Sequence, residues 1–139
     1  MSADAKKVMS EYEYLRNQAE ALQKNLEMIN ASLTEIDAVL ETLDEIKEQG
    51  KKNEILMPIG ADSFVSARVI DTKKVIVGLG ADVAVKKSIP GARKDLEARF
   101  KELEGVRGEI SEKLGTLMNR IEELSPQVQR IVAGARGEG

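Results

Sequence analysis

Apolar residues recur along the first third of the chain at intervals that alternate between four and three. The series comprises Val8, Tyr12, Leu15, Ala19, Leu22, Leu26, Ile29, Leu33, Ile36, Leu40 and Leu43. This spacing is the a/d seam of a coiled coil, sustained over about five heptads. Gly50 follows the polar run Lys47-Glu48-Gln49 and predicts the end of the helix.

The last third of the chain repeats this pattern. The second series comprises Leu96, Phe100, Leu103, Arg107, Ile110, Leu114, Leu117, Ile121, Leu124, Val128, Ile131 and Ala135. Pro90 lies where a first-turn proline would open the helix. Arg107 is the polar member of the series, and two interpretations are open: its stem covers the seam while its head reaches water, or it sets the register.

The two seams predict an antiparallel helical hairpin with the middle segment at the connecting end. One register brings Leu40 near Leu103, and a slide by one heptad fits almost as well. The helix breakers of the second helix all fall at outer b or f positions: Gly105, Gly108, Gly115 and Pro126. Either outer positions tolerate them, or they make the helix compliant with a hinge at Ser125-Pro126.

The middle segment has the period-two alternation and β-branched residues of strands. Gly-Ala-Asp occurs at 60–62 and again at 80–82, which predicts two β-hairpins in tandem. The run VIVGLGADVAVKK, 75–87, begins like a phosphate-binding loop, but Val83 stands where a third glycine is needed and no helix pattern follows. We therefore interpret Gly80 as a turn residue and Gly78 as a site of close backbone packing.

Four short strands bury little apolar area by themselves, and open sheet edges pair readily with other chains. We therefore predict that the hairpins complete a sheet or barrel with other subunits. The apolar positions expected to do so form the assembly set: Phe64, Val69, Val75, Val77, Val83 and Val85. The alternative is a four-stranded sheet within one chain that needs no partner.

Composition narrows the possible functions. The 139 residues include no cysteine or histidine, which excludes thiol nucleophiles, Ser-His-Asp triads and the usual zinc ligands. No catalytic residues, metal site or cofactor site are predicted, and we expect the chain not to be an enzyme. A net charge of −3 without a basic block argues against nucleic acid as a partner. No signal peptide or membrane span is recognisable, so a cytoplasmic, membrane-free protein is expected.

Near the chain ends the apolar pattern is wider than the seam. Met9 flanks Val8 and Tyr12, and Val132 flanks Val128 and Ile131. This pattern is either a broader packing stripe or a surface exposed where the coiled coil frays, and clustered exposed apolar groups mark interaction sites.

The whole chain resembles the alpha-type subunit of archaeal prefoldin. The resemblance rests on the two heptad helices, the double hairpin, the run V-G-L-G-A-D-V-A-V-K-K at 77–87, and Ser125-Pro126-Gln127. It implies one prefoldin-like domain over 1–139, with an α+β fold: coiled-coil helices over 1–49 and 90–139, and a double β-hairpin over 50–89 that joins an intersubunit β-barrel.

The resemblance also implies a function. Two alpha and four beta-type subunits would form an ATP-independent chaperone that holds non-native proteins at its coiled-coil tips and passes them to a group II chaperonin. Carried onto this chain, the client-binding role falls on the tip set: Val8, Met9, Tyr12, Leu15, Val128, Ile131 and Val132. The alternative is a structural coiled-coil scaffold or filament subunit that binds no clients.

Overall fold

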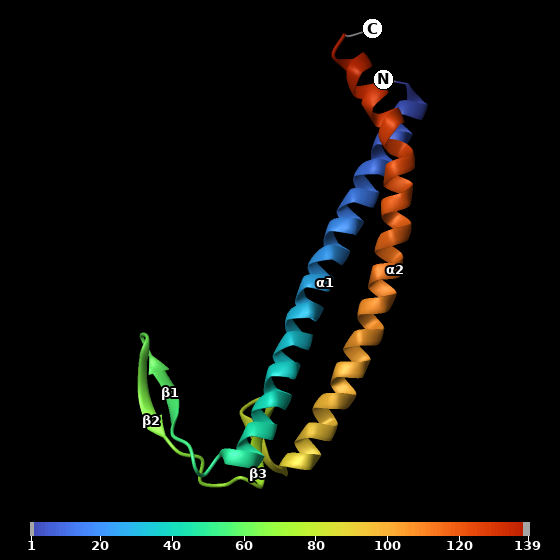
Figure 1. Ribbon diagram of the computed structural model, residues 1–139. Coiled ribbons are helices and arrows are strands. Elements are labelled where there is room, and N and C mark those ends of the chain that lie inside the picture. Colours follow the sequence, from blue (N-terminus) through green and yellow to red (C-terminus); the bar gives the residue numbers. More distant parts are fainter. Residues whose placement is uncertain (1, 138–139) are drawn as a thin grey trace. The chain divides into compact units, whose positions relative to one another are not determined.

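The computed structural model describes residues 2–137, and its elements follow the predicted order (Figure 1). Helix α1 (Ala3–Gln49) precedes strands β1 (Ile55–Gly60), β2 (Ser63–Ala67), β3 (Lys74–Gly80) and β4 (Val83–Ser88), and helix α2 (Ile89–Ala135) follows. The fold is therefore α+β, with two long helices and two β-hairpins between them. The predicted segments 1–49 and 90–139 include residues 1, 138 and 139, which lie outside the described residues.

Each helix begins at a serine cap. The Ser2 Oγ accepts a hydrogen bond from the Ala5 N–H at 3.0 Å, and the Ser88 Oγ accepts one from the Gly91 N–H at 3.1 Å. A capping hydroxyl satisfies one of the amides that the first helical turn leaves free. Pro90, with no N–H to satisfy, lies in the first turn of α2 as the sequence predicts.

The chain divides into two compact units. The terminal unit comprises Met1–Ala31 and Leu103–Gly139, so it pairs the beginning of α1 with the end of α2. The head unit comprises Ser32–Glu102 and holds the end of α1, both hairpins and the beginning of α2.

In the terminal unit the helices run antiparallel, because Glu11 contacts Arg120 while Asn30 contacts Arg107. A Leu40–Leu103 register would place Asn30 opposite residue 113. The helices are therefore offset by about one heptad, which is the second register that the sequence left open. Arg107 at the seam donates a hydrogen bond from Nη1 to the Asn30 Oδ1 at 3.3 Å, so its head binds the partner helix.

The heptad seam is the buried stripe of both helices. Every predicted seam position of α1 is buried or half-buried, and so is every one of α2 except Ala135, which is exposed. Leu124 is the most deeply buried side chain, at 2% exposure. On α2 the buried stripe also extends towards the N-terminus of the helix, to Ala92 and Ile89.

The core of the head unit lies where the helices meet the second hairpin. Leu43, Ile89 and Ala92 are buried together, and Val75 and Val77 of β3 pack against them. A backbone hydrogen bond from the Ile89 N–H to the Lys73 carbonyl, 2.9 Å long, ties the start of α2 to the residue before β3. The hairpin β3–β4 is thereby fixed to the helices through one face.

The strands form two separate two-stranded antiparallel sheets, β1–β2 and β3–β4. The four-stranded sheet within one chain, considered as an alternative, does not form. In each hairpin the Gly-Ala-Asp repeat makes the turn, with positive φ at Ala61 and Asp62 and again at Ala81 and Asp82. Two central residues with positive φ match the right-handed twist of the flanking strands.

The two glycines of VIVGLGADVAVKK have different roles. Gly80 has φ +88° at the start of the turn, so its predicted turning role is confirmed. Gly78 was expected to allow close backbone packing, but no atom lies within 4 Å of where its Cβ would be. That expectation is wrong for the isolated chain, because this face of β3 is open.

Candidate functional site: two apolar interaction surfaces

The two hairpins carry most of the exposed apolar surface. Of the fifteen large apolar side chains exposed among the described residues, ten lie between Ile55 and Val83. We call nine of them, those on the strands, the hairpin surface: Ile55, Leu56, Met57, Ile59, Phe64, Val65, Ile76, Leu79 and Val83. Such a concentration is unusual for a chain that acts alone, and it marks an interaction site.

The two hairpins differ in how much of this surface they leave open. In β1 every residue is exposed, and neighbouring residues Leu56 and Met57 point to opposite faces of the strand. The hairpin β1–β2 therefore presents apolar groups on both faces. In β3 the half-buried Val75 and Val77 alternate with exposed Ile76, so only one face is open.

The structure places the six residues of the assembly set in two environments. Phe64 and Val83 are exposed on the strands, at 57% and 54%. Val75 and Val77 contact the core of the head unit, and Val69 and Val85 are half-buried. The other large apolar groups exposed on the strands lie outside the assembly set: Ile55, Leu56, Met57, Ile59, Val65, Ile76 and Leu79.

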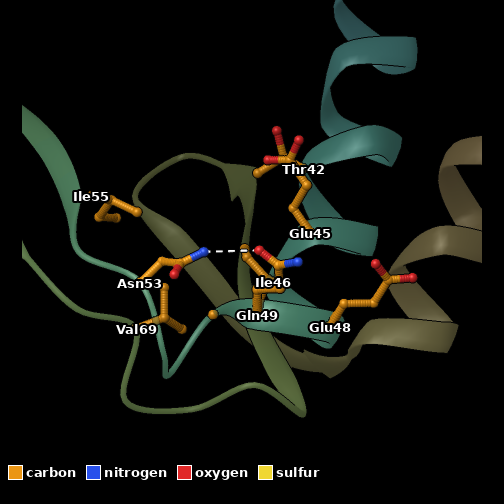
Figure 2. A pocket seen from close by; sticks show the side chains of 9 residues that line it. Thr42, Glu45, Ile46, Glu48, Gln49, Asn53, Ile55 and Val69 are labelled. Atoms are coloured by element: carbon orange, nitrogen blue, oxygen red, sulfur yellow. Dashed lines mark hydrogen bonds between the residues drawn. The ribbon is translucent and has the colours of Figure 1, made fainter.

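An open pocket lies between the end of α1 and the first hairpin (Figure 2). Ile46, Ile55 and Val69 supply its apolar lining, and Glu45 and Glu48 also line it. The Asn53 side-chain amide donates to the Gln49 Oε1 at 2.9 Å, which ties the connecting loop to the helix end. This pocket continues the hairpin surface through Ile55.

The tip set lies together in the terminal unit, but it is not openly exposed. Val128 is buried, and the other six residues are half-buried along the contact between the helices. Tyr14, which lies between Tyr12 and Leu15 on α1, is 62% exposed. A shallow groove lies between the beginning of α1 and the end of α2. Its lining includes Val8 on α1 and Ile131 on α2.

An ion pair joins the helices next to this set. The Arg120 Nε donates to the Glu11 Oε1 at 2.9 Å, and its Nη2 donates to the Glu11 Oε2 at 3.3 Å. This fork of hydrogen bonds lowers the pKa of Glu11. The same hydrogen bonds, together with one to Glu123, raise the pKa of Arg120.

The described residues hold no group of three or more side chains suited to binding a metal ion. No helix over residues 2–137 is long and apolar enough to span a bilayer. The glycine pair at 78 and 80 belongs to strand β3 of a hairpin, without the helix that a phosphate loop requires.

Comparison with known proteins identifies the class. The model of the prefoldin subunit family matches residues 15–134 of this chain. The chain therefore belongs to the prefoldin family, a family of chaperone subunits rather than a known family of enzymes.

Within this family, the curated relatives indicate an archaeal subunit of the alpha type. Prefoldin subunit alpha of Pyrococcus horikoshii is 36% identical over 129 residues, which cover 92% of this chain and 87% of the relative. Prefoldin subunit alpha 1 of Thermococcus kodakarensis is 39% identical over 105 residues, covering 73% and 72%. The alpha subunit of Methanopyrus kandleri is 46% identical over 69 residues, covering 50% of this chain and 44% of the relative.

The fold also matches a solved structure. A chain in the cryo-EM structure of filamentous prefoldin from Methanocaldococcus jannaschii aligns with a TM-score of 0.71 and 24% identity, covering 85% of this chain and 98% of that one. The resemblance inferred from the heptads and the double hairpin is thus confirmed as to family and fold.

Proposed function

We propose that the chain is a subunit of an ATP-independent holdase. In this proposal the hairpin surface binds other prefoldin subunits, two alpha with four beta-type chains, to form a shared β-barrel. The tip set captures non-native proteins, and a group II chaperonin receives them. The observation that carries the proposal is the apolar hairpin surface, which the isolated chain leaves open on two unpaired sheets.

Partner strands would cover the parts of the hairpins that the chain itself leaves unpaired. Each two-stranded sheet has edges with free backbone donors and acceptors, and Leu56 and Phe64 stand exposed beside them. Isolated hairpins are marginally stable in water. Strand addition from a second subunit would satisfy the backbone groups and bury the apolar side chains together.

The terminal unit offers the features that a client-holder needs. It carries several apolar groups of modest size. One of them is Met9, whose flexible side chain adapts to variable partners. Apolar burial contributes about 25 cal/mol per Å², so one arm binds weakly after ordering costs. Several arms in one assembly sum to useful avidity and still release their client. No step of this cycle requires a nucleotide.

The proposal is tested with the complex of this chain and its beta-type partner. The complex should suppress aggregation of a chemically denatured enzyme in buffer without ATP. Replacing Val8 and Ile131 by serine should weaken that suppression, and removing residues 1–15 and 125–139 should abolish it. The matched control is Met118→Ser. Met118 is an apolar residue that is 50% exposed, and it lies on α2, like Ile131, but further from the chain end.

Two results would contradict the proposal. If the truncated complex protects the enzyme as well as the full one, the tip set is not the client site. If the complex assembles but never affects aggregation, the chain is a structural scaffold, the alternative that the sequence left open.

A further inference from the structure

The tip set is closed in this structure, although the proposed function requires it to contact clients. Tyr12 and Leu15 are half-buried, and Val128 is only 9% exposed. The helices must separate locally before these side chains can meet another chain. What limits that separation also determines how much apolar surface a client encounters.

Burial along α2 decreases steadily towards its end. Leu124 is 2% exposed and Val128 is 9% exposed, while Ile131 is half-buried and Ala135 is exposed. The groove lined by Val8 and Ile131 lies in this loosely packed part. The contact between the helices is therefore firm at Leu124 and weakens outwards.

The Glu11–Arg120 pair lies one helical turn before Leu124. Among the described residues of the terminal unit, the helices are joined by polar side-chain bonds at two places, this pair and Asn30–Arg107. From the pair to the chain ends, the contact between the helices is held by apolar packing. The fork is thus the polar contact nearest to the tip set.

Helix α2 is weakened just beyond the pair. Pro126 has no N–H, so the carbonyl of Glu122 lacks its usual donor four residues later. The Ser125 Oγ donates to the Ile121 carbonyl at 2.8 Å, which further alters the hydrogen bonding at this turn. Bending or fraying that begins at the chain end can therefore pass Pro126 at low cost and then meets the buried Leu124 and, one turn further in, the ion pair.

We propose that the Glu11–Arg120 pair is a latch that limits how far the chain ends open. With the latch closed, opening is confined to the segments outside it, 2–10 and 126–137, and exposes Val8 and Ile131. With the latch broken, opening extends inwards through Leu124 to Arg120 on α2 and through Glu11 to Tyr12 on α1, and it enlarges the apolar surface. The effect of the latch on client capture rests on the proposed function. The latch itself is a property of the terminal unit and does not depend on that function.

Hydrogen exchange on the full chain tests the latch directly. Glu11→Gln keeps the shape and removes the charge, and Glu13→Gln is the control, since Glu13 is exposed and makes no ion pair among the described residues. We expect amides 4–10 and 127–135 to exchange about two- to five-fold faster in Glu11→Gln, the range for loss of an exposed ion pair. Amides 92–100 should not change in either variant.

A double-mutant cycle separates the latch from the other bond of Arg120, the one to Glu123. If the latch exists, adding Glu11→Gln to Arg120→Gln should accelerate exchange no further than Arg120→Gln alone. The latch is refuted if the amides of Glu11→Gln and Glu13→Gln exchange at the same rates. It is also refuted if Glu11→Gln accelerates exchange equally along the whole of each helix.

Client capture is measured separately, so that the two proposals fail in different ways. With the beta-type partner present, Glu11→Gln should suppress aggregation at a lower concentration than the Glu13→Gln control. Faster exchange without this gain leaves the latch in place and contradicts the tip set as the client site.

Discussion

Replacing Leu124 by alanine should loosen the terminal unit more than any other single truncation in it. Leu124 is the most deeply buried side chain among the described residues, at 2% exposure, and it lies on the seam one turn beyond Arg120. Its neighbours belong to only two helices, so the substitution removes contacts that no other element can replace.

The magnitude follows from the burial. Leu→Ala substitutions in protein cores cost about 2–5 kcal/mol, and the lower part of the range applies where the surroundings can collapse into the cavity. Two helices without a third layer can move together, so we expect about 2–3 kcal/mol. At 25 °C this raises the population of the open helix pair about 30- to 150-fold.

Hydrogen exchange by mass spectrometry resolves this effect along the chain. Amides 12–22 and 117–128 should exchange faster by that factor in Leu124→Ala, while those of the second hairpin, 74–88, keep their rates. Met118→Ala is the control: its side chain is half exposed, and we expect a change below about 0.5 kcal/mol. Equal exchange in the two variants would refute the assignment of Leu124 to the core of the terminal unit.

Three further predictions concern local features. Ser88→Ala removes the cap of α2 and should lower stability by about 1 kcal/mol, measured as a fall in the thermal midpoint. Arg107→Leu makes the seam continuously apolar, so the midpoint should rise, while disulfide trapping at paired cysteines should detect more than one helix register. Hydrogen bonds from the Lys73 and Lys74 backbone amides lower the pKa of Asp71. The stability that these bonds contribute is therefore present above the ordinary Asp pKa of about 4 and lost as the pH falls through the lower folded value, and an Asp71→Asn variant should lack this part of the acid titration.

The helices could be predicted because their signal is periodic and long. Eleven seam positions on α1 fix one face of the helix, and all of them are buried or half-buried in the structure. The register is less determined, because the apolar seam positions coincide almost equally well after a slide of seven residues. The bond between Arg107 and Asn30 selects one register, and a single seam arginine does not reveal its partner in the sequence.

The hairpins were predicted from β-branched runs and the repeated Gly-Ala-Asp, but their packing was not. Alternation shows that Val75 and Val77 share a face, yet it does not show that this face meets Leu43 of the same chain. In β1 both faces are apolar, so apolar and polar residues do not alternate in a way that distinguishes a buried face from an exposed one. The pattern therefore does not single out Leu56 and Met57, which are exposed in the structure.

The client-binding residues stay a prediction, because their exposure depends on opening of the helix ends. Sequence shows a wider apolar stripe at the ends, and the structure shows that stripe closed. An apolar group that serves both helix pairing and client binding has the same signature as one that serves pairing alone.

Photo-crosslinking from single positions can show which surface binds clients and which binds other subunits. A photoreactive phenylalanine analogue is placed at position 131 or position 64, and the complex with the beta-type partner is irradiated with a denatured client, without ATP. We expect position 131 to crosslink to the client and position 64 to another prefoldin subunit. Client crosslinks at position 64 with none at position 131 would contradict this expectation.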